Sequence, residues 1–418
     1  RFGANLLRSA SILGQFTTLC LDLGSIYCVL PRFCCNLLRS ASIWGSYSSM
    51  SVPDRTIFLY TSNIRERYVA DALAAVALPI GGRIRFRYDR RHTSDELQRE
   101  WGRSKGTRAL IHLSIQHPQR FHDSALLPLR QATVVDATQR GEILTIDLEL
   151  GDYLTFAGLP TGTEPNKAQR LELGRRIRTY SEFLERDDRY PSPDNDPPRS
   201  AGLVPAFETV QGDLETAKLP LARGNDAAFR AIVDYLSATL TNPERFYYRV
   251  VGIRPIDSDK FLEAKDGEFW LTTGSTYVVE VFHRQENLAM IPSELRFAVG
   301  DGLNARDIET LTLTSAYDAF SVVVDVPNRP DITRSYLELA PRASSAAASI
   351  RINVVLSPSN AQKYALPAAG AVAAGAVAFA ATDAVPTDGW GAALAVGLAG
   401  TVFGLGLWQS KRGLKILP

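Results

Sequence analysis

Cysteine and catalytic signature motifs are scarce in this chain of 418 residues. All four cysteines lie within the first 35 residues, so the remaining chain can hold no disulfide framework and no thiolate metal site. A Gly-rich phosphate loop, a G-x-S-x-G motif and an H-E-x-x-H motif are all missing. These absences exclude thiol nucleophiles from the main body of the chain. We expect neither a metal ion nor a cofactor.

The chain also has no large excess of positive or negative charge. The formal net charge is +1, which gives no overall bias toward nucleic acid or anionic lipid. The chain is 45% hydrophobic, and its length allows two or three domains.

The N-terminal region contains a near-duplication. "RFGANLLRSASILG" at 1–14 returns as "RFCCNLLRSASIWG" at 32–45, with 11 of 14 positions identical. Two close copies of an apolar phrase are too few to bury a repeat core. We therefore expect residues 1–49 to be a non-native or unstructured extension and Met50 to be the biological start. The alternative is a targeting segment, because 12–30 is apolar with basic flanks.

Two long uncharged runs lie near the C-terminus. They comprise 19 residues from Tyr364 to Thr382 and 22 residues from Gly389 to Ser410. A bilayer core of about 30 Å is crossed by roughly 20 apolar helical residues. The pattern predicts a transmembrane helical hairpin over 364–410, and the alternative is a pair of buried Ala-rich helices.

The charges that flank these runs predict the orientation of the hairpin. Lys363 precedes it and Lys411 and Arg412 follow it, whereas the intervening loop has no Lys or Arg. We expect the inner (plasma) membrane of a bacterium, with soluble domains on the cytoplasmic side and the lipid bilayer as a partner. Gly400 and Gly404 have the spacing that brings helices close, which predicts a homo-oligomer through the hairpin.

Two further modules are predicted before the hairpin. Residues 50–158 alternate strand-like and helical patterns, which predicts an α+β module with a mixed sheet or small barrel and helices. A charged helix and a Pro- and Asp-rich linker follow over 159–202. Residues 203–357 open with one helix and then give about seven strand patterns, typical of an immunoglobulin-like β-sandwich.

The most distinctive local chemistry lies in the basic segment 83–108, which has nine Lys and Arg against four acidic residues. On a strand, Arg83, Arg85 and Arg87 share one face while Phe86 lies on the other. A row of guanidinium groups binds phosphate well. The candidate ligand-binding residues are Arg83, Arg85, Arg87, Arg90, Arg91 and Lys105. The alternative is a solvated sheet face paired with Asp89, Glu96 and Glu100.

Three of the five histidines lie within 112–122. Their spacing of five residues fits no single-element zinc motif. We interpret His112 as a core or edge residue of a strand. His117 and His122 flank a proline turn next to Asp123 and are weak candidates for acid–base catalysis.

These observations favour a binding or signalling protein at the membrane over an enzyme. Its ligand would be an anionic small molecule or nucleic acid, and ligand binding could trigger the hairpin as a membrane effector. The alternative is a membrane-tethered hydrolase or nuclease that uses His117, His122 and carboxylates of the first module.

Overall fold

The computed structural model places one compact unit that begins at Asp54. The described residues are 55–117, 120–159, 167–192, 199–224, 226–240, 246–285, 293–306, 310–313, 315, 317–328, 333–342 and 347–359. Within them, the side chains at 117, 120–124, 167 and 317 are not described. The predicted extension 1–49 and the predicted hairpin 364–410, with Gly400 and Gly404, lie outside these residues.

The described structure is built mainly from sheets. No helix in this part of the chain is both long enough and apolar enough to cross a membrane. The predicted fold class, with its C-terminal transmembrane hairpin, is therefore corrected to a multi-sheet α+β structure that has no membrane-spanning helix in the described residues. The prediction rested on the length of the uncharged runs and on the residues that flank and space them, which are properties of the sequence pattern rather than of observed structure.

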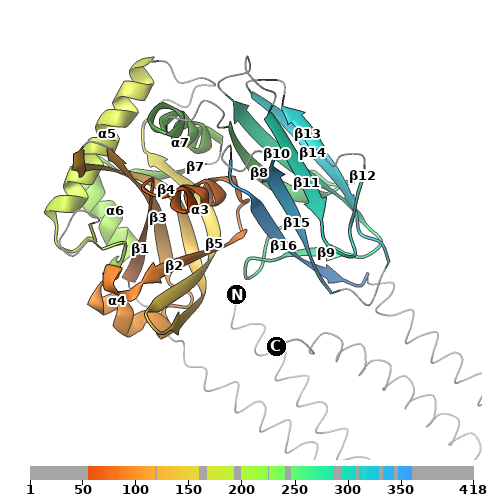
Figure 1. Cartoon of the computed structure of the whole chain (residues 1–418), viewed down its shortest axis with the longest axis horizontal. Coiled ribbons are helices and arrows are strands. Elements are labelled where there is room, and N and C mark those ends of the chain that lie inside the picture. Colours follow the sequence, from red (N-terminus) through yellow and green to blue (C-terminus); the bar gives the residue numbers. More distant parts are fainter. Residues whose placement is uncertain are drawn as a thin grey trace, which may run out of the picture. The chain divides into compact units, whose positions relative to one another are not determined.

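The first sheet has seven strands and is mixed (Figure 1). The strand order is β2-β5-β4-β3-β1-β6, with β7 pairing on β5; β1 and β3 run parallel and the other pairs are antiparallel. The strands are β1 (Arg55–Ser62), β2 (Arg83–Asp89), β3 (Arg108–His117), β4 (Arg120–Arg140), β5 (Ile143–Phe156), β6 (Ala201–Pro205) and β7 (Leu221–Gly224).

The sheet curls so that the segment after β2 approaches β6. Thr93 bridges Ala201, and the Ser94 amide donates to the Ala201 carbonyl at 2.9 Å. Across the interior, the Tyr88 hydroxyl of β2 donates to the Tyr60 carbonyl of β1 at 3.3 Å. The curl therefore brings together strands that are far apart in the strand order, and it encloses an apolar core.

Helices cover this sheet and link it to the rest of the chain. α3 packs against β1 and also against β8 of the following sheet, and α5 packs along β4. The helices are α3 (Glu66–Ala77), α4 (Asp95–Glu100), α5 (Lys167–Arg186), α6 (Phe207–Thr216) and α7 (Asp226–Thr239), with single 3-10 turns η1 (Arg90–His92) and η2 (Trp101–Arg103). The apolar spacing in α3 explains its burial, because Val69, Leu73 and Val76 lie on one side of the helix.

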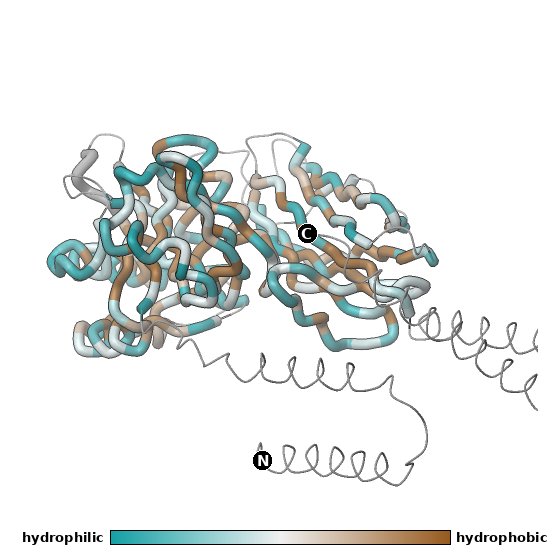
Figure 2. The backbone as a smooth tube through the Cα atoms, turned by 90° about the horizontal axis from the view of Figure 1, so that it is seen from below, coloured by the Kyte–Doolittle hydropathy of each residue, from teal (hydrophilic) through white to brown (hydrophobic). Residues whose placement is uncertain are grey.

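The later strands form a four-stranded sheet, β12-β14-β10-β8, and a five-stranded sheet, β13-β11-β15-β16-β9. The Tyr248 hydroxyl on β8 donates to the Leu339 carbonyl on β15 at 3.1 Å, which joins the two sheets across their shared core. Figure 2 shows hydrophobic residues in brown along the inner runs of the tube and hydrophilic residues in teal at many of its outer turns. The strands are β8 (Phe246–Pro255), β9 (Phe269–Thr272), β10 (Thr276–Gln285), β11 (Ser293–Val299), β12 (Asn304–Arg306), β13 (Thr310–Leu313), β14 (Tyr317–Asp325), β15 (Arg334–Pro341) and β16 (Ile350–Ser357).

The strand pairing differs from the predicted division at residue 203. β6 pairs with β1 and β7 pairs with β5, so the chain returns to the first sheet after the Pro- and Asp-rich segment. Composition identified that segment as a linker. Composition carries no information about whether the chain after this linker starts a new core or returns to the previous sheet.

Ion pairs lie where α7 meets the later strands, one with an exposed carboxylate at Asp226 and one buried at Asp234. Asp226 of α7 pairs with Arg249 of β8, and Asp234 pairs with Arg284 of β10. Asp234 and Arg284 have side-chain exposures of 1% and 4%. Arg170 of α5 also approaches Asp234, at 3.9 Å. One helix therefore supplies carboxylates that tie the four-stranded sheet to the helices of the first sheet.

A fully buried arginine lies beside this region. Arg130 of β4 donates to the carbonyls of Ala75 at 3.1 Å, Leu78 at 2.6 Å and Gly151 at 2.9 Å. Its guanidinium lies 4.4 Å from the centre of the Tyr153 ring, and that of Arg249 lies 5.8 Å from the same centre. Carbonyls and the ring face thus replace water around Arg130.

We predict that Asp234→Asn destabilises the full chain by about 3–5 kcal/mol, because it leaves the Arg284 guanidinium buried without its countercharge. Urea unfolding followed by tryptophan fluorescence measures the change. Asp301→Asn, an exposed position in the turn before β12, is the matched control and should stay within about 0.5 kcal/mol. A loss below about 1 kcal/mol at Asp234 would show that the pair contributes little.

Candidate functional site

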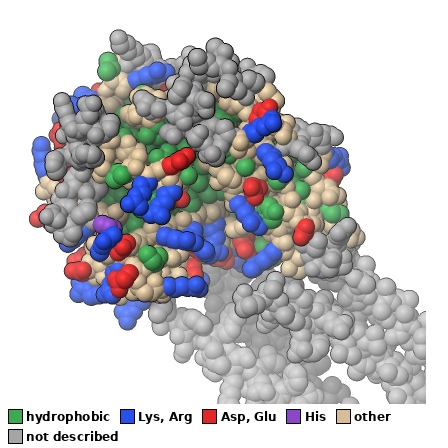
Figure 3. Space-filling view, viewed as in Figure 1, with side chains coloured by type: hydrophobic (Ala, Val, Ile, Leu, Met, Phe, Trp, Pro, Cys, Tyr) green, Lys and Arg blue, Asp and Glu red, His purple; other side chains and the backbone are tan. Residues whose placement is uncertain are grey.

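The arginine row lies on β2, where the alternation agrees with the sequence pattern. Ile84, Phe86 and Tyr88 are buried, whereas Arg85 and Arg87 are exposed and Arg83 is partly exposed. β2 is an end strand of the first sheet. Figure 3 shows Lys and Arg side chains, with acidic ones among them, on the face that includes β2.

One carboxylate of β5 holds two of these arginines. Asp147 is 4% exposed; it accepts from Arg85 at 2.5 Å and 2.8 Å and also pairs with Arg83. Burial opposes ionisation of Asp147, but the hydrogen bonds from Arg85 and Arg83 outweigh it and lower its pKa. Arg83 and Arg85 are therefore paired within the fold, with a carboxylate that the sequence analysis did not name.

Three of the other basic candidates lie at the end of β2 and in the turn that follows it. The Arg87 side chain is exposed and has no hydrogen bond or close ion pair within the described part of the chain, although its charge acts on Asp71, opposing the rise in the Asp71 pKa that burial causes. Arg90 donates to the Gln98 side chain at 2.6 Å, and Arg91 pairs with Asp89 at 3.2 Å at an exposed position. An exposed pair of this kind contributes little and is readily exchanged for a ligand.

Lys105 lies in the turn after η2, beside β4 rather than β2. The next residue, Gly106, donates to the Val134 carbonyl at 2.8 Å, and Val134 aligns through Leu148 of β5 with Ile84 near the start of β2. The indole nitrogen of Trp101 in η2 donates to the Thr138 carbonyl at 3.0 Å, which anchors the turn that carries Lys105. The exposed candidate cations outside the Asp147 cluster, here called the basic end, are Arg87, Arg90 and Arg91 at the end of β2 and Lys105 in the turn after η2.

The histidine candidates have different outcomes. His112 is fully buried; its ring lies 2.8 Å from the Tyr180 hydroxyl and 4.9 Å, centre to centre, from the Phe58 ring. Its assignment to the core is confirmed. The side chains of His117, His122 and Asp123 lie outside the described residues, so their catalytic role stays a prediction. No group of three His, Cys, Asp or Glu able to hold a metal ion occurs in the described ranges.

A groove of about 520 Å³ lies beside the C-terminal half of α5 and the residues that follow α6. Sequence reasoning missed it. Its apolar wall consists of Phe183, Ala217 and Leu219, and its charged wall consists of Glu182, Arg186, Asp187, Asp188 and Arg189. Only the packing of α5 against the end of α6 creates the groove, and no sequence motif marks its lining.

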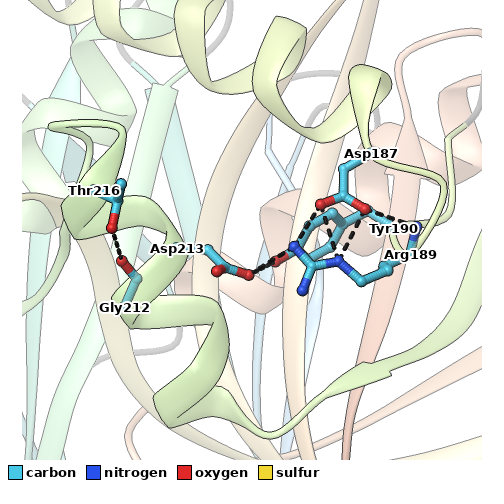
Figure 4. Close-up of polar contacts among 6 residues, drawn as sticks. All are labelled: Asp187, Arg189, Tyr190, Gly212, Asp213 and Thr216. Atoms are coloured by element: carbon cyan, nitrogen blue, oxygen red, sulfur yellow. Dashed lines mark hydrogen bonds and ion pairs between the residues drawn. The ribbon is translucent and has the colours of Figure 1, made fainter.

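The charged wall is ordered by an ion-pair network (Figure 4). Arg189 donates to Asp187 at 3.0 Å and to Asp213 of α6 at 2.9 Å, and the Tyr190 hydroxyl bonds Asp213 at 3.2 Å. The hydrogen bond from Arg189 lowers the pKa of Asp187. Burial is the main reason that the pKa of Tyr190 is raised, so Tyr190 stays protonated as a donor.

No known family model matches the sequence, and no curated protein matches it at a significant level. The basic end and the groove are therefore the two features of the described residues that point to a function.

We predict a pH dependence of stability from His112. Burial lowers its pKa to about 3, whereas an unfolded histidine titrates near 6.5. Between these values the unfolded state binds one proton more than the folded state, so the free energy of unfolding falls as the pH falls. The largest slope from this group is about 1.4 kcal/mol per pH unit.

His112→Phe should make that slope shallower between about pH 6.5 and about pH 4.5. The variant should also be less stable near pH 7, because Tyr180 loses its buried partner. Urea unfolding across this range measures both effects. Equal slopes for the wild type and the variant would show that His112 does not cause the acid sensitivity.

Proposed function

We propose that the chain is a binding protein whose basic end takes an anionic ligand that carries phosphate groups. The supporting observation is the exposed Arg87, which has no ion-pair partner among the described residues and lies beside η1 with Arg90 and Arg91. Guanidinium groups offer paired donors that match phosphate oxygens. The ligand class can be a nucleic-acid backbone or a phosphorylated small molecule.

The ion pairs on β2 indicate which basic residues would contact the ligand. Asp147 holds Arg83 and Arg85, so these two would support the strand, while Arg87, Arg90, Arg91 and Lys105 would meet the ligand. The competing explanation is that charged residues on an end strand prevent pairing with other chains. In that case the arginines affect aggregation and bind no anion.

We expect a labelled single-stranded oligonucleotide, or inorganic polyphosphate, to bind the full chain and to bind more weakly as salt rises. Arg87→Ala/Lys105→Ala should weaken binding at least tenfold, because each lost charge-assisted contact costs on the order of 1.5–3 kcal/mol. Fluorescence anisotropy at two salt concentrations measures the affinity.

Two further variants separate binding from folding. Arg296→Ala removes an exposed arginine on β11 and should leave the affinity unchanged. Arg85→Ala removes a partner of the buried Asp147, so it should lower stability more than Arg87→Ala does. If neither probe binds the wild type, or if the double variant binds as tightly, the proposal is wrong.

A further inference from the structure

We infer that the groove between α5 and the end of α6 is a second binding site, which takes a small organic cation with an apolar group. This site is independent of the anionic ligand proposed for the basic end. Its volume of about 520 Å³ lies within the range of small-molecule sites, which is roughly 300–1,000 Å³.

The apolar wall suits a hydrocarbon or aryl group. Leu219 is 4% exposed and belongs to the core, while Phe183 is partly exposed and packs against the core from the groove side. The Phe183 ring centre lies 6.0 Å from that of Tyr190, which helps to fix the position of the ring. A ligand group placed here would remove part of the Phe183 surface from water.

The charges of the wall favour a cation. Glu182, Asp187 and Asp188 oppose Arg186 and Arg189, which gives 2 − 3 = −1 for the lining. Both arginines are already paired: Arg186 with Glu182 at 3.6 Å, and Arg189 with Asp187 and Asp213. An anion would have to displace those carboxylates.

Asp188 is the carboxylate of the groove lining that pairs with neither Arg186 nor Arg189. It lines the groove and has no hydrogen bond or ion pair in the described part of the chain. An ammonium group on the ligand could pair with Asp188 while the Phe183 ring offers its negative face to the same cation. These two contacts explain why the site would select an amine over a neutral or acidic molecule of equal size.

Phenethylamine is the probe, and 3-phenylpropionate is its anionic counterpart with the same aryl chain. Isothermal titration of the full chain should give saturable binding of phenethylamine with a dissociation constant on the order of 1 mM, as expected for so few atoms. Asp188→Asn and Phe183→Leu should each weaken binding about fivefold.

Asp301→Asn, an exposed carboxylate in a turn of the later sheets, is the matched control and should not change the affinity. Circular dichroism verifies the fold of each variant, and Asp188→Asn decides the result if Phe183→Leu proves unstable. The inference is overturned by any one of three results: no saturable phenethylamine binding up to about 10 mM, equal binding of 3-phenylpropionate, or unchanged binding by Asp188→Asn. Because the probes differ in charge from those for the basic end, either proposal can fail without the other.

Discussion

Neutralisation of buried guanidinium groups determines how the sheets are held together. An arginine keeps its charge in a protein interior, so each buried one needs a carboxylate or several carbonyls close by. Arg284 has Asp234 and Arg130 has backbone carbonyls. Asp234 has a second arginine partner besides Arg284, because Arg170 of α5 lies 3.9 Å from the same carboxylate. The position of α5, and through it the groove, thus depends on α7.

The same physical rule organises the surface of β2. Asp147 is nearly inaccessible and would be costly as an isolated charge, and Arg83 and Arg85 offset that cost. Their participation leaves Arg87 as the arginine of β2 whose exposed guanidinium has no close ion pair within the described residues. A structural ion-pair cluster and a candidate binding surface are therefore consecutive on one strand. The two differ because Asp147 pairs with Arg83 and Arg85 but not with Arg87.

The two candidate sites have opposite electrostatic character and different origins. The basic end is made from residues close in sequence, so the concentration of Lys and Arg in 83–108 pointed to it. The groove gathers α5, the turn after it and the end of α6, and its lining has almost balanced charge. Composition therefore revealed one site and not the other. For the groove, the informative quantity is which charges remain unpaired, and this depends on side-chain geometry.

The sequence by itself determined the alternation on β2, since period-two apolar spacing forces Phe86 inward and Arg85 outward. It placed His112 in an apolar strand but left open whether the residue is in the core or at an edge, and the structure shows it fully buried. Tertiary structure decided the return of β6 and β7 to the first sheet and the pairing of Arg85 with Asp147, 62 residues away. The physical reason is the separation along the chain over which each interaction acts. Side-chain periodicity is set by neighbouring residues, whereas ion pairing and sheet order depend on contacts that a linear pattern does not contain.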